Sequence, residues 1–301
     1  MAPIIKNVVV AGASGNLGSE AVKALIESGF NVTVLSRSSN KSFPSNVAVK
    51  VVDFNSIESL SAAFEGQDAV VDTTFSFEPK TGSNLIDAAA AKGVYRFITS
   101  DFGLDPDNPG VAEMPVFGRK QASYNHVKKV AAEGKMTYSL IACGSFFDLC
   151  LENPVYSGID LKGKSADLFD AGDNVLPWTT LSDVGKAISG VLKHPEETQN
   201  RPVYVHGAYL SQLDILEEAK NVIGKDGWTV TNKAMQPLLD QSFAELKSGN
   251  ITETTFLVQI TYCLAKKELT HPWSNDDNAL VGIREMTSGE IQDIIRKTAQ
   301  K

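Results

Sequence analysis

The chain has few cysteines and histidines, and neither type falls into a ligand pattern. Its 301 residues include three cysteines with no Cys-x-x-Cys pair and four histidines with no His-x-x-x-His spacing. An odd number of cysteines at such distances argues against a disulfide scaffold, and the usual zinc spacings are absent. The sequence therefore predicts no metal site.

Positive charge is also scarce, because 28 Lys and Arg stand against 36 Asp and Glu, a net charge of −8. Nucleic-acid binders need clustered cations for phosphate contacts, so we expect no direct nucleic-acid partner. No segment approaches the ~20 apolar residues of a membrane span. The N-terminus lacks the architecture of a signal peptide, since a glycine-rich stretch interrupts its apolar run. We expect a cytoplasmic protein without a membrane partner.

The first 150 residues show a strict alternation of short apolar runs and helical patterns. The apolar runs are rich in Val and Ile, and the stretches between them repeat apolar residues three and four apart. This alternation predicts a parallel sheet covered by helices on both faces, with right-handed crossovers. Strands are expected at 7–12, 31–35, 47–52, 69–72, 96–99 and 137–143, with helices at 17–28, 57–64, 85–91 and 117–133.

The alternation weakens after about residue 145, where glycine, proline and polar turns become frequent. We expect a Rossmann-type doubly wound parallel sheet in residues 1–150, with a strand and a helix returning to it near 178–210. Residues 151–301 are expected to form a smaller C-terminal substrate-binding portion. Helices are expected there at 180–193, 211–223, 235–247 and 288–297, and residues 225–285 have the least readable pattern.

A glycine-rich turn stands between the first strand and the first helix, with the spacing G-x-x-G-x-x-G. Glycine lets the backbone approach a pyrophosphate, and the following helix offers free N–H groups and the positive end of its dipole. The alternative is that the glycines only form a tight turn. A Walker loop is excluded because no Gly-Lys-Ser/Thr follows. The cofactor contacts expected here are Gly12, Ser14, Gly15, Asn16, Leu17 and Gly18.

The second strand ends in a cation where an NAD-selective site has an acid ~20 residues beyond the glycines. No acid occurs between Glu27 and Asp53, whereas Arg37 stands at this place with Lys41 nearby. An arginine can form a fork onto a 2′-phosphate, so the sequence predicts NADPH/NADP over NADH. The alternative is a solvated surface arginine. Further cofactor contacts are expected from Asp53 near the adenine and from Thr73, Thr74 and Phe75 after the fourth strand.

Several segments together resemble the NmrA-like and isoflavone-reductase-like group of atypical short-chain dehydrogenases/reductases, with fungal features. They are the glycine turn, the Ser-Arg end of the second strand and residues 99–107. Plant members carry Ser-Glu-Phe-Gly followed by Asp-Pro-Asp, and here Asp101 replaces the glutamate. Residues 116–120 resemble the group's Phe-x-x-Lys, and residues 176–187 match a stretch of fungal members. The resemblance covers roughly residues 4–215.

This resemblance implies that NADPH delivers a hydride to a small aromatic, phenolic or secondary-metabolite substrate. It makes Lys120 the acid/base and a ribose-binding residue, the plain alternative being a surface lysine. A lysine that is partly desolvated beside a cationic nicotinamide ring releases its proton more readily, which suits the role. It also implies that the loop after the sixth strand passes the nicotinamide, with Gly144 and Phe146 in contact. Phe146 and Phe147 would form an apolar wall, unless they are ordinary core residues.

A competing motif lies in the same helix, where Tyr124 and Lys128 form the Tyr-x-x-x-Lys of ordinary short-chain dehydrogenases. In that mechanism the lysine lowers the pKa of the tyrosine, which donates the proton. Helical spacing places both Tyr124 and Lys128, and Lys120 and Tyr124, on one face. Only one pair can face the nicotinamide. We favour Lys120, whose segment fits the closer family, and keep Tyr124 as a neighbouring residue of the catalytic site.

Three functions are compatible with these patterns. The first is an NADPH-dependent reductase of a small aromatic substrate, and the second is a non-catalytic NAD(P)-sensing regulator that binds a protein partner. The third is a general short-chain dehydrogenase or epimerase that acts through Tyr124 and Lys128. We favour the reductase because Lys120 and the glycine turn occur together. A monomer and a homodimer both remain open, since no interface pattern stands out.

Overall fold

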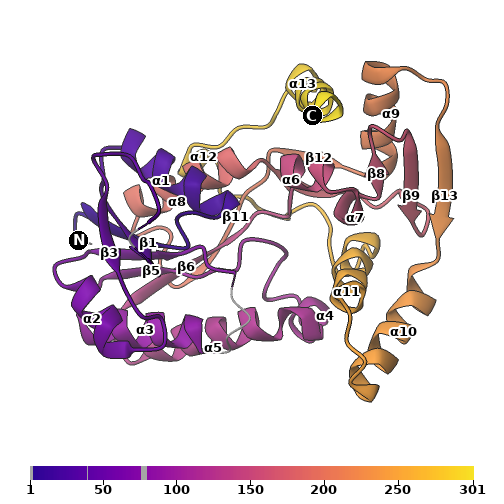
Figure 1. Ribbon diagram of the computed structural model, residues 1–301. Coiled ribbons are helices and arrows are strands. Elements are labelled where there is room, and N and C mark those ends of the chain that lie inside the picture. Colours follow the sequence, from indigo (N-terminus) through magenta and orange to yellow (C-terminus); the bar gives the residue numbers. More distant parts are fainter. Residues whose placement is uncertain (1–2, 39, 76–79) are drawn as a thin grey trace.

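A computed structural model describes residues 3–38, 40–75 and 80–301 of the chain. In this part, a seven-stranded sheet has the order β11-β6-β5-β4-β1-β2-β3 (Figure 1). All its neighbouring strands pair in parallel. The Rossmann-type doubly wound sheet expected from the sequence is confirmed. Its strands are β1 (Asn7–Ala11), β2 (Asn31–Ser36), β3 (Ala48–Val51), β4 (Ala69–Asp72), β5 (Arg96–Ile98), β6 (Thr137–Ala142) and β11 (Arg201–Tyr204).

The central strands are apolar on both sides because helices cover both faces of the sheet. Successive side chains of a strand point to opposite faces. Val8 and Val10 of β1 therefore belong to one hydrophobic cluster, and Val9 and Ala11 belong to another. This is why β1 is a continuous apolar run and does not alternate with polar residues.

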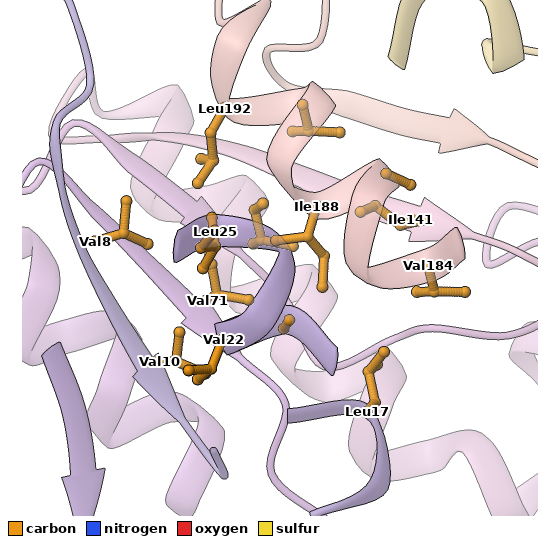
Figure 2. Close-up of a cluster of buried hydrophobic side chains, with 14 of the residues drawn as sticks. Val8, Val10, Leu17, Val22, Leu25, Val71, Ile141, Val184, Ile188 and Leu192 are labelled. Atoms are coloured by element: carbon orange, nitrogen blue, oxygen red, sulfur yellow. The ribbon is translucent and has the colours of Figure 1, made fainter. Parts of the chain in front are cut away.

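One face of the sheet is covered by α1 (Asn16–Glu27) and α8 (Leu181–Lys193), which lie side by side (Figure 1). Figure 2 shows Leu25 of α1 and Ile188 of α8 packed over the strand residue Val71. The two helices approach closely, since a Cβ on Gly185 would lie 2.7 Å from the carbonyl oxygen of Glu20. The opposite face is covered by α2 (Ile57–Phe64), α3 (Thr81–Ala91) and α5 (Gly118–Ala132).

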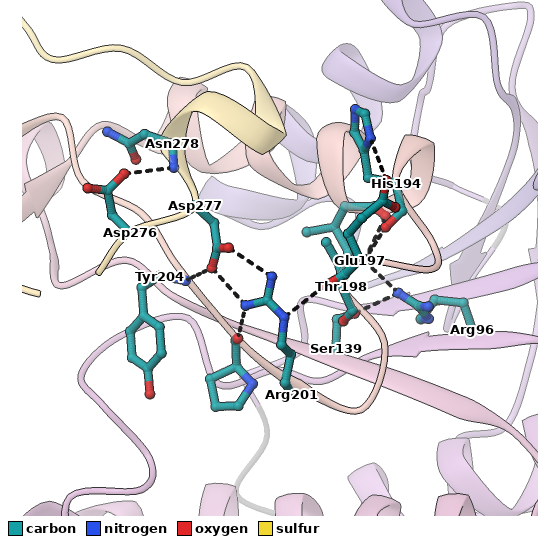
Figure 3. Close-up of polar contacts among 12 residues, drawn as sticks. Arg96, Ser139, His194, Glu197, Thr198, Arg201, Tyr204, Asp276, Asp277 and Asn278 are labelled. Atoms are coloured by element: carbon teal, nitrogen blue, oxygen red, sulfur yellow. Dashed lines mark hydrogen bonds and ion pairs between the residues drawn. The ribbon is translucent and has the colours of Figure 1, made fainter. Parts of the chain in front are cut away.

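Arg96 is a fully buried charge that ties three segments together at the start of β5. It donates to the hydroxyl oxygens of Thr137 at 2.9 Å and Ser139 at 2.7 Å on β6. It also donates to the hydroxyl of Thr198 at 3.0 Å, as Figure 3 shows. A further bond goes to the carbonyl of Pro195 at 2.5 Å, ahead of β11. Burial lowers the pKa of Arg96 to about 10. These neutral acceptors compensate a charge that would otherwise be costly to bury.

The chain after β6 builds two small sheets and packs around a third hydrophobic cluster. One sheet contains β7 (Ser145–Phe146), β10 (Leu176–Thr179) and β12 (Ala208–Leu210), and the other contains β8 (Ile159–Asp160), β9 (Ser165–Phe169) and β13 (Thr229–Lys233). The helices are α6 (Phe147–Glu152), α7 (Pro154–Ser157), α9 (Gln212–Ile223), α10 (Met235–Ser248), α11 (Glu253–Ala265), α12 (Asn278–Val281) and α13 (Ser288–Gln300). Two short helices, α4 (Pro109–Ala112) and the 3-10 helix η1 (Pro115–Phe117), precede α5. Among the described residues, no helix combines the length and hydropathy needed to cross a membrane.

The close contact of α1 and α8 leads to a stability prediction. Gly185→Ala should lower the free energy of unfolding by about 1–3 kcal/mol, because the new methyl group meets rigid backbone and must push the helices apart. The matched control is Gly118→Ala in α5, where a Cβ meets nothing within 4 Å. It should leave stability unchanged or raise it by up to about 1 kcal/mol. Urea denaturation of both variants gives the comparison. Equal effects of the two substitutions would contradict this account of the packing.

Candidate functional site

The sheet has a topological switch point between β1 and β4. From β1 the chain continues to β2 and β3 on one side, and then to β4, β5 and β6 on the other. In open α/β sheets, the crevice outside the carboxyl ends of the strands at such a point binds ligands. The segments at this edge include the glycine turn after β1, residues 73–75 after β4, residues 99–103 after β5 and residues 144–146 after β6.

The glycine turn lies directly against the end of β4. Gly12 has φ +82°, and a Cβ there would lie 2.7 Å from the carbonyl carbon of Thr73. A Cβ on Gly18 would lie 2.1 Å from the carbonyl oxygen of Gly12, to which the N–H of Gly15 donates at 2.9 Å. Glycine at positions 12 and 18 is thus required by the turn itself.

The turn also leaves the start of α1 uncapped. Gly15 is the N-cap residue and offers no side chain, and no acid occurs in the first turn. The first N–H groups of a helix have no partner within the helix, so they are available to an anion, with the dipole in its favour. Asn16 opens the helix and Leu17 packs beneath it in the hydrophobic cluster. The structure therefore brings the predicted residues 12–18 together in one tight turn at the uncapped start of α1.

Two cations lie on the β2 side of this turn. Arg37 is exposed directly after β2. Lys41 donates from Nζ to the hydroxyl of Ser14 at 2.6 Å, which places its ammonium at the glycine turn. Asp53 is exposed, and its Oδ1 accepts from the N–H of Asn55 at 2.9 Å in the turn that leads into α2. From the sequence, Lys41 was expected only to lie near Arg37; its hydrogen bond to Ser14 could not be predicted from spacing.

The residues after β4 are fixed by short hydrogen bonds. Thr73 donates from its N–H and its hydroxyl to the carbonyl of Ala11, at 2.9 and 2.7 Å. Thr74 donates in the same two ways to Oδ1 of Asp72, at 2.8 and 2.7 Å. Phe75, which follows them, is 85% exposed. Thr73 is therefore tied to β1 and Thr74 to the end of β4, while most of the Phe75 side chain is exposed.

Lys120 lies at the carboxyl edge, in the first turn of α5. Its half-buried side chain donates from Nζ to the carbonyl of Asp101 at 3.4 Å. The same Nζ would lie 3.9 Å from a Cβ on Gly103. The carbonyl of Gly103 accepts from the N–H groups of Cys143 and Gly144 at 3.0 and 2.9 Å, which ties this segment to the end of β6. The ammonium group of Lys120 thus lies near the ends of β5 and β6.

Tyr124, one turn further along α5 than Lys120, is buried in the hydrophobic cluster between this helix and the sheet. Its hydroxyl donates to Oδ1 of Asp107 at 3.2 Å, and its ring meets the edge of Tyr138. Lys128 places Nζ 3.9 Å from the centre of the Tyr124 ring, not at the hydroxyl. Burial, with Tyr138 and Asp107 nearby, raises the pKa of Tyr124 far above its ordinary value. The Tyr-x-x-x-Lys mechanism needs the opposite shift, so this position gives the motif no support.

The segment after β6 brings one of the two expected phenylalanines to the edge. Gly144 has φ +66°, and a Cβ there would lie 2.0 Å from the carbonyl oxygen of Pro177. Phe146 is half-buried, whereas Phe147 is fully buried against Trp178. The predicted apolar wall is therefore reduced to Phe146. A cavity of about 270 Å³ lies away from these residues, lined by side chains of α7, α10 and α11 such as Val155, Met235 and Leu257.

Sequence reasoning did not include the two buried acids of this edge in the site. Burial raises the pKa of Asp72 to about 6, against the hydrogen bonds from Thr74. Burial also raises the pKa of Asp101 to about 6, against the positive charge of Lys120. Strong pKa shifts in a crevice are typical of functional sites.

Comparison with known proteins agrees with this geometry. The model of the NmrA-like family matches residues 5–253 of the chain. The chain is 29% identical over 298 residues to the oxidoreductase poxI of Penicillium oxalicum, covering 96% of this chain and 93% of that protein. It is 30% identical over 262 residues to the oxidoreductase aprR of Aspergillus flavus, covering 85% and 87% of the two chains.

A solved structure with the same fold is the binary complex of leucoanthocyanidin reductase and NADPH from Vitis vinifera. Its TM-score is 0.79 at 17% identity, and the match covers 98% of this chain and 100% of that one. At this identity the likeness concerns the fold alone. The resemblance drawn from the sequence is confirmed by the match of the family model: the chain belongs to the NmrA-like family.

Proposed function

We propose that the chain is an NADPH-dependent reductase that transfers a hydride to a small aromatic or phenolic substrate. The observation that carries this proposal is the position of Lys120, whose Nζ lies at the ends of β5 and β6 beside Asp101 and Gly103. A regulator that only binds the cofactor does not need a proton donor there. The names of the two fungal relatives, both oxidoreductases, support the same reading.

The residues of the edge fit a phosphorylated dinucleotide. The glycine turn leaves no room for a side chain at positions 12 and 18, and the uncapped start of α1 suits a pyrophosphate. Arg37 and Lys41 would hold the 2′-phosphate on the β2 side. Asp53 would lie near the adenine. On the nicotinamide side, the expected contacts are Thr73, Thr74, Phe75, Lys120, Gly144 and Phe146.

When bound, NADPH supplies the hydride. Lys120 would donate a proton from Nζ to the substrate atom that gains the electron pair. The neutral amine would then take up a new proton from solvent water. The exposed ring of Phe75 and the half-buried ring of Phe146 offer apolar surfaces to an aromatic substrate. The buried thiol of Cys143 takes no part as a nucleophile, because burial raises its pKa to about 12.

Arg37→Ala tests the choice of cofactor. We expect the affinity for NADPH to fall about tenfold or more, because a charge-assisted fork to the 2′-phosphate is lost, while the affinity for NADH stays the same. Calorimetric titration with both nucleotides measures the ratio. The matched control is Lys23→Ala, which removes an exposed cation from α1. An unchanged NADPH/NADH ratio in the Arg37 variant would refute the assignment.

Lys120→Met tests the proton donor. Turnover should fall by about 10²–10⁴, the usual contribution of general acid–base catalysis, with NADPH still bound. The loss of NADPH absorbance with an aromatic enone or isoflavone found by screening is the assay. Tyr124→Phe discriminates the competing motif and should retain turnover, because its hydroxyl is directed to Asp107. A large loss in the tyrosine variant together with an active Lys120 variant would reverse the assignment.

A further inference from the structure

Two carboxyl groups are buried side by side where adjacent strands end. Asp72 is the last residue of β4 and is 3% exposed, and Asp101 follows β5 and is 6% exposed. The two strands pair in parallel with Val71 opposite Ile98, so both acids lie at the same edge. Besides burial, the negative charge of Asp101 raises the pKa of Asp72. The two carboxyl groups are therefore close enough to interact with each other, and with the charge of a ligand bound over this edge.

Their hydrogen bonding is incomplete within the described residues. Asp72 accepts twice from Thr74. The Oδ2 atom of Asp101 and the hydroxyl of Thr99 are buried there with no partner at ordinary hydrogen-bond distance, although Thr99 is near enough to lower the pKa of Asp101 against the effect of burial. Lys120 donates to the backbone carbonyl of Asp101 and not to its carboxylate. With all three groups ionised, two acids and one base leave a net negative charge at the ends of β4 and β5.

We propose that Asp72 and Asp101 determine which redox form of the nicotinamide cofactor this edge prefers, because their ionised forms favour the oxidised ring. The inference rests on the proposed function, which places the nicotinamide half over these strand ends. The oxidised ring carries one positive charge and the reduced ring carries none. All phosphates are the same in both forms, so the ratio of the two affinities isolates the field at the ring.

The direction of the pH dependence follows from the surroundings of the pair. Burial is the largest cause that raises the pKa of both acids to about 6. The groups that act on them are Thr74 on Asp72, and Lys120 from α5 and Thr99 on Asp101. Lys120 also acts on the thiol of Cys143 at the end of β6. The Cys143 thiol stays neutral near neutral pH, because burial raises its pKa to about 12. As the pH falls, the carboxyl groups take up protons and the preference for the oxidised ring weakens.

The test is calorimetric titration of the wild type with NADP⁺ and with NADPH at about pH 5 and about pH 8. The ratio of the NADP⁺ affinity to the NADPH affinity should rise about tenfold between these pH values, as expected for a unit charge within several ångströms in a partly buried site. In Asp101→Asn, most of this rise should be lost. Asp72→Asn is the second variant, used if Asp101→Asn does not fold. It is expected to lose part of the rise in the affinity ratio.

Two controls separate charge from packing. Asp101→Glu keeps the carboxylate and should retain the rise. Asp68→Asn removes an acid just before β4, at the opposite end of the strand, where Oδ2 accepts from the N–H groups of Lys6 and Asn7. It should behave like the wild type.

The outcomes distinguish this inference from the proposed function. If both nucleotides bind but their affinity ratio is independent of pH, or if the Asn variants keep the full rise, the inference is overturned and the proposed function stands. If neither nucleotide binds at either pH, the proposed function fails and the inference fails with it.

Discussion

The backbone of the glycine turn lies against the end of β4 with no space for a side chain between them. A Cβ on Gly12 would meet the carbonyl group of Thr73 at 2.7 Å. This contact is made at the switch point of the sheet, where the strand order reverses. It fixes where α1 begins and leaves the start of that helix uncapped. Because ligands of such sheets bind at the switch point, this contact determines where a dinucleotide would bind and which way it would be oriented.

The rest of the edge is assembled by backbone hydrogen bonds between strand ends that are distant in sequence. Gly103 accepts from Cys143 and Gly144, and Thr73 donates to Ala11. Lys120 then reaches the carbonyl of Asp101 from α5. Candidate site residues from four loops are therefore held in place by the strand ends, and the edge combines two buried acids with one half-buried base. That combination suits a site at which charge changes on both cofactor and substrate.

The doubly wound sheet was readable from the sequence because its central strands are buried on both faces. Such strands are continuous apolar runs that a pattern identifies. The helix α11 was missed because its buried positions include Thr255, Gln259 and Thr261, which interrupt the apolar stripe. Gln259 is buried because it accepts from the N–H of Val116 and donates to Ser242. The strands β8 and β12 were missed because two or three residues are too few to show a period.

The glycine turn and the cation after β2 were equally readable, since both follow from spacing along the chain. The choice between Lys120 and Tyr124 was not, because helical spacing allows either to face the edge. Packing of the Tyr124 ring against Tyr138 separates them. The burial of Asp72 and Asp101 was also beyond the pattern, because it depends on the segments that cover the strand ends.

The most direct test of this account is a crystal structure of the chain with NADP⁺. The account predicts that the pyrophosphate lies at the start of α1, with the 2′-phosphate beside Arg37. The nicotinamide ring should lie over the ends of β4 and β5, within reach of Lys120. A dinucleotide bound with its ring directed away from Lys120, or bound elsewhere on the molecule, would contradict the account.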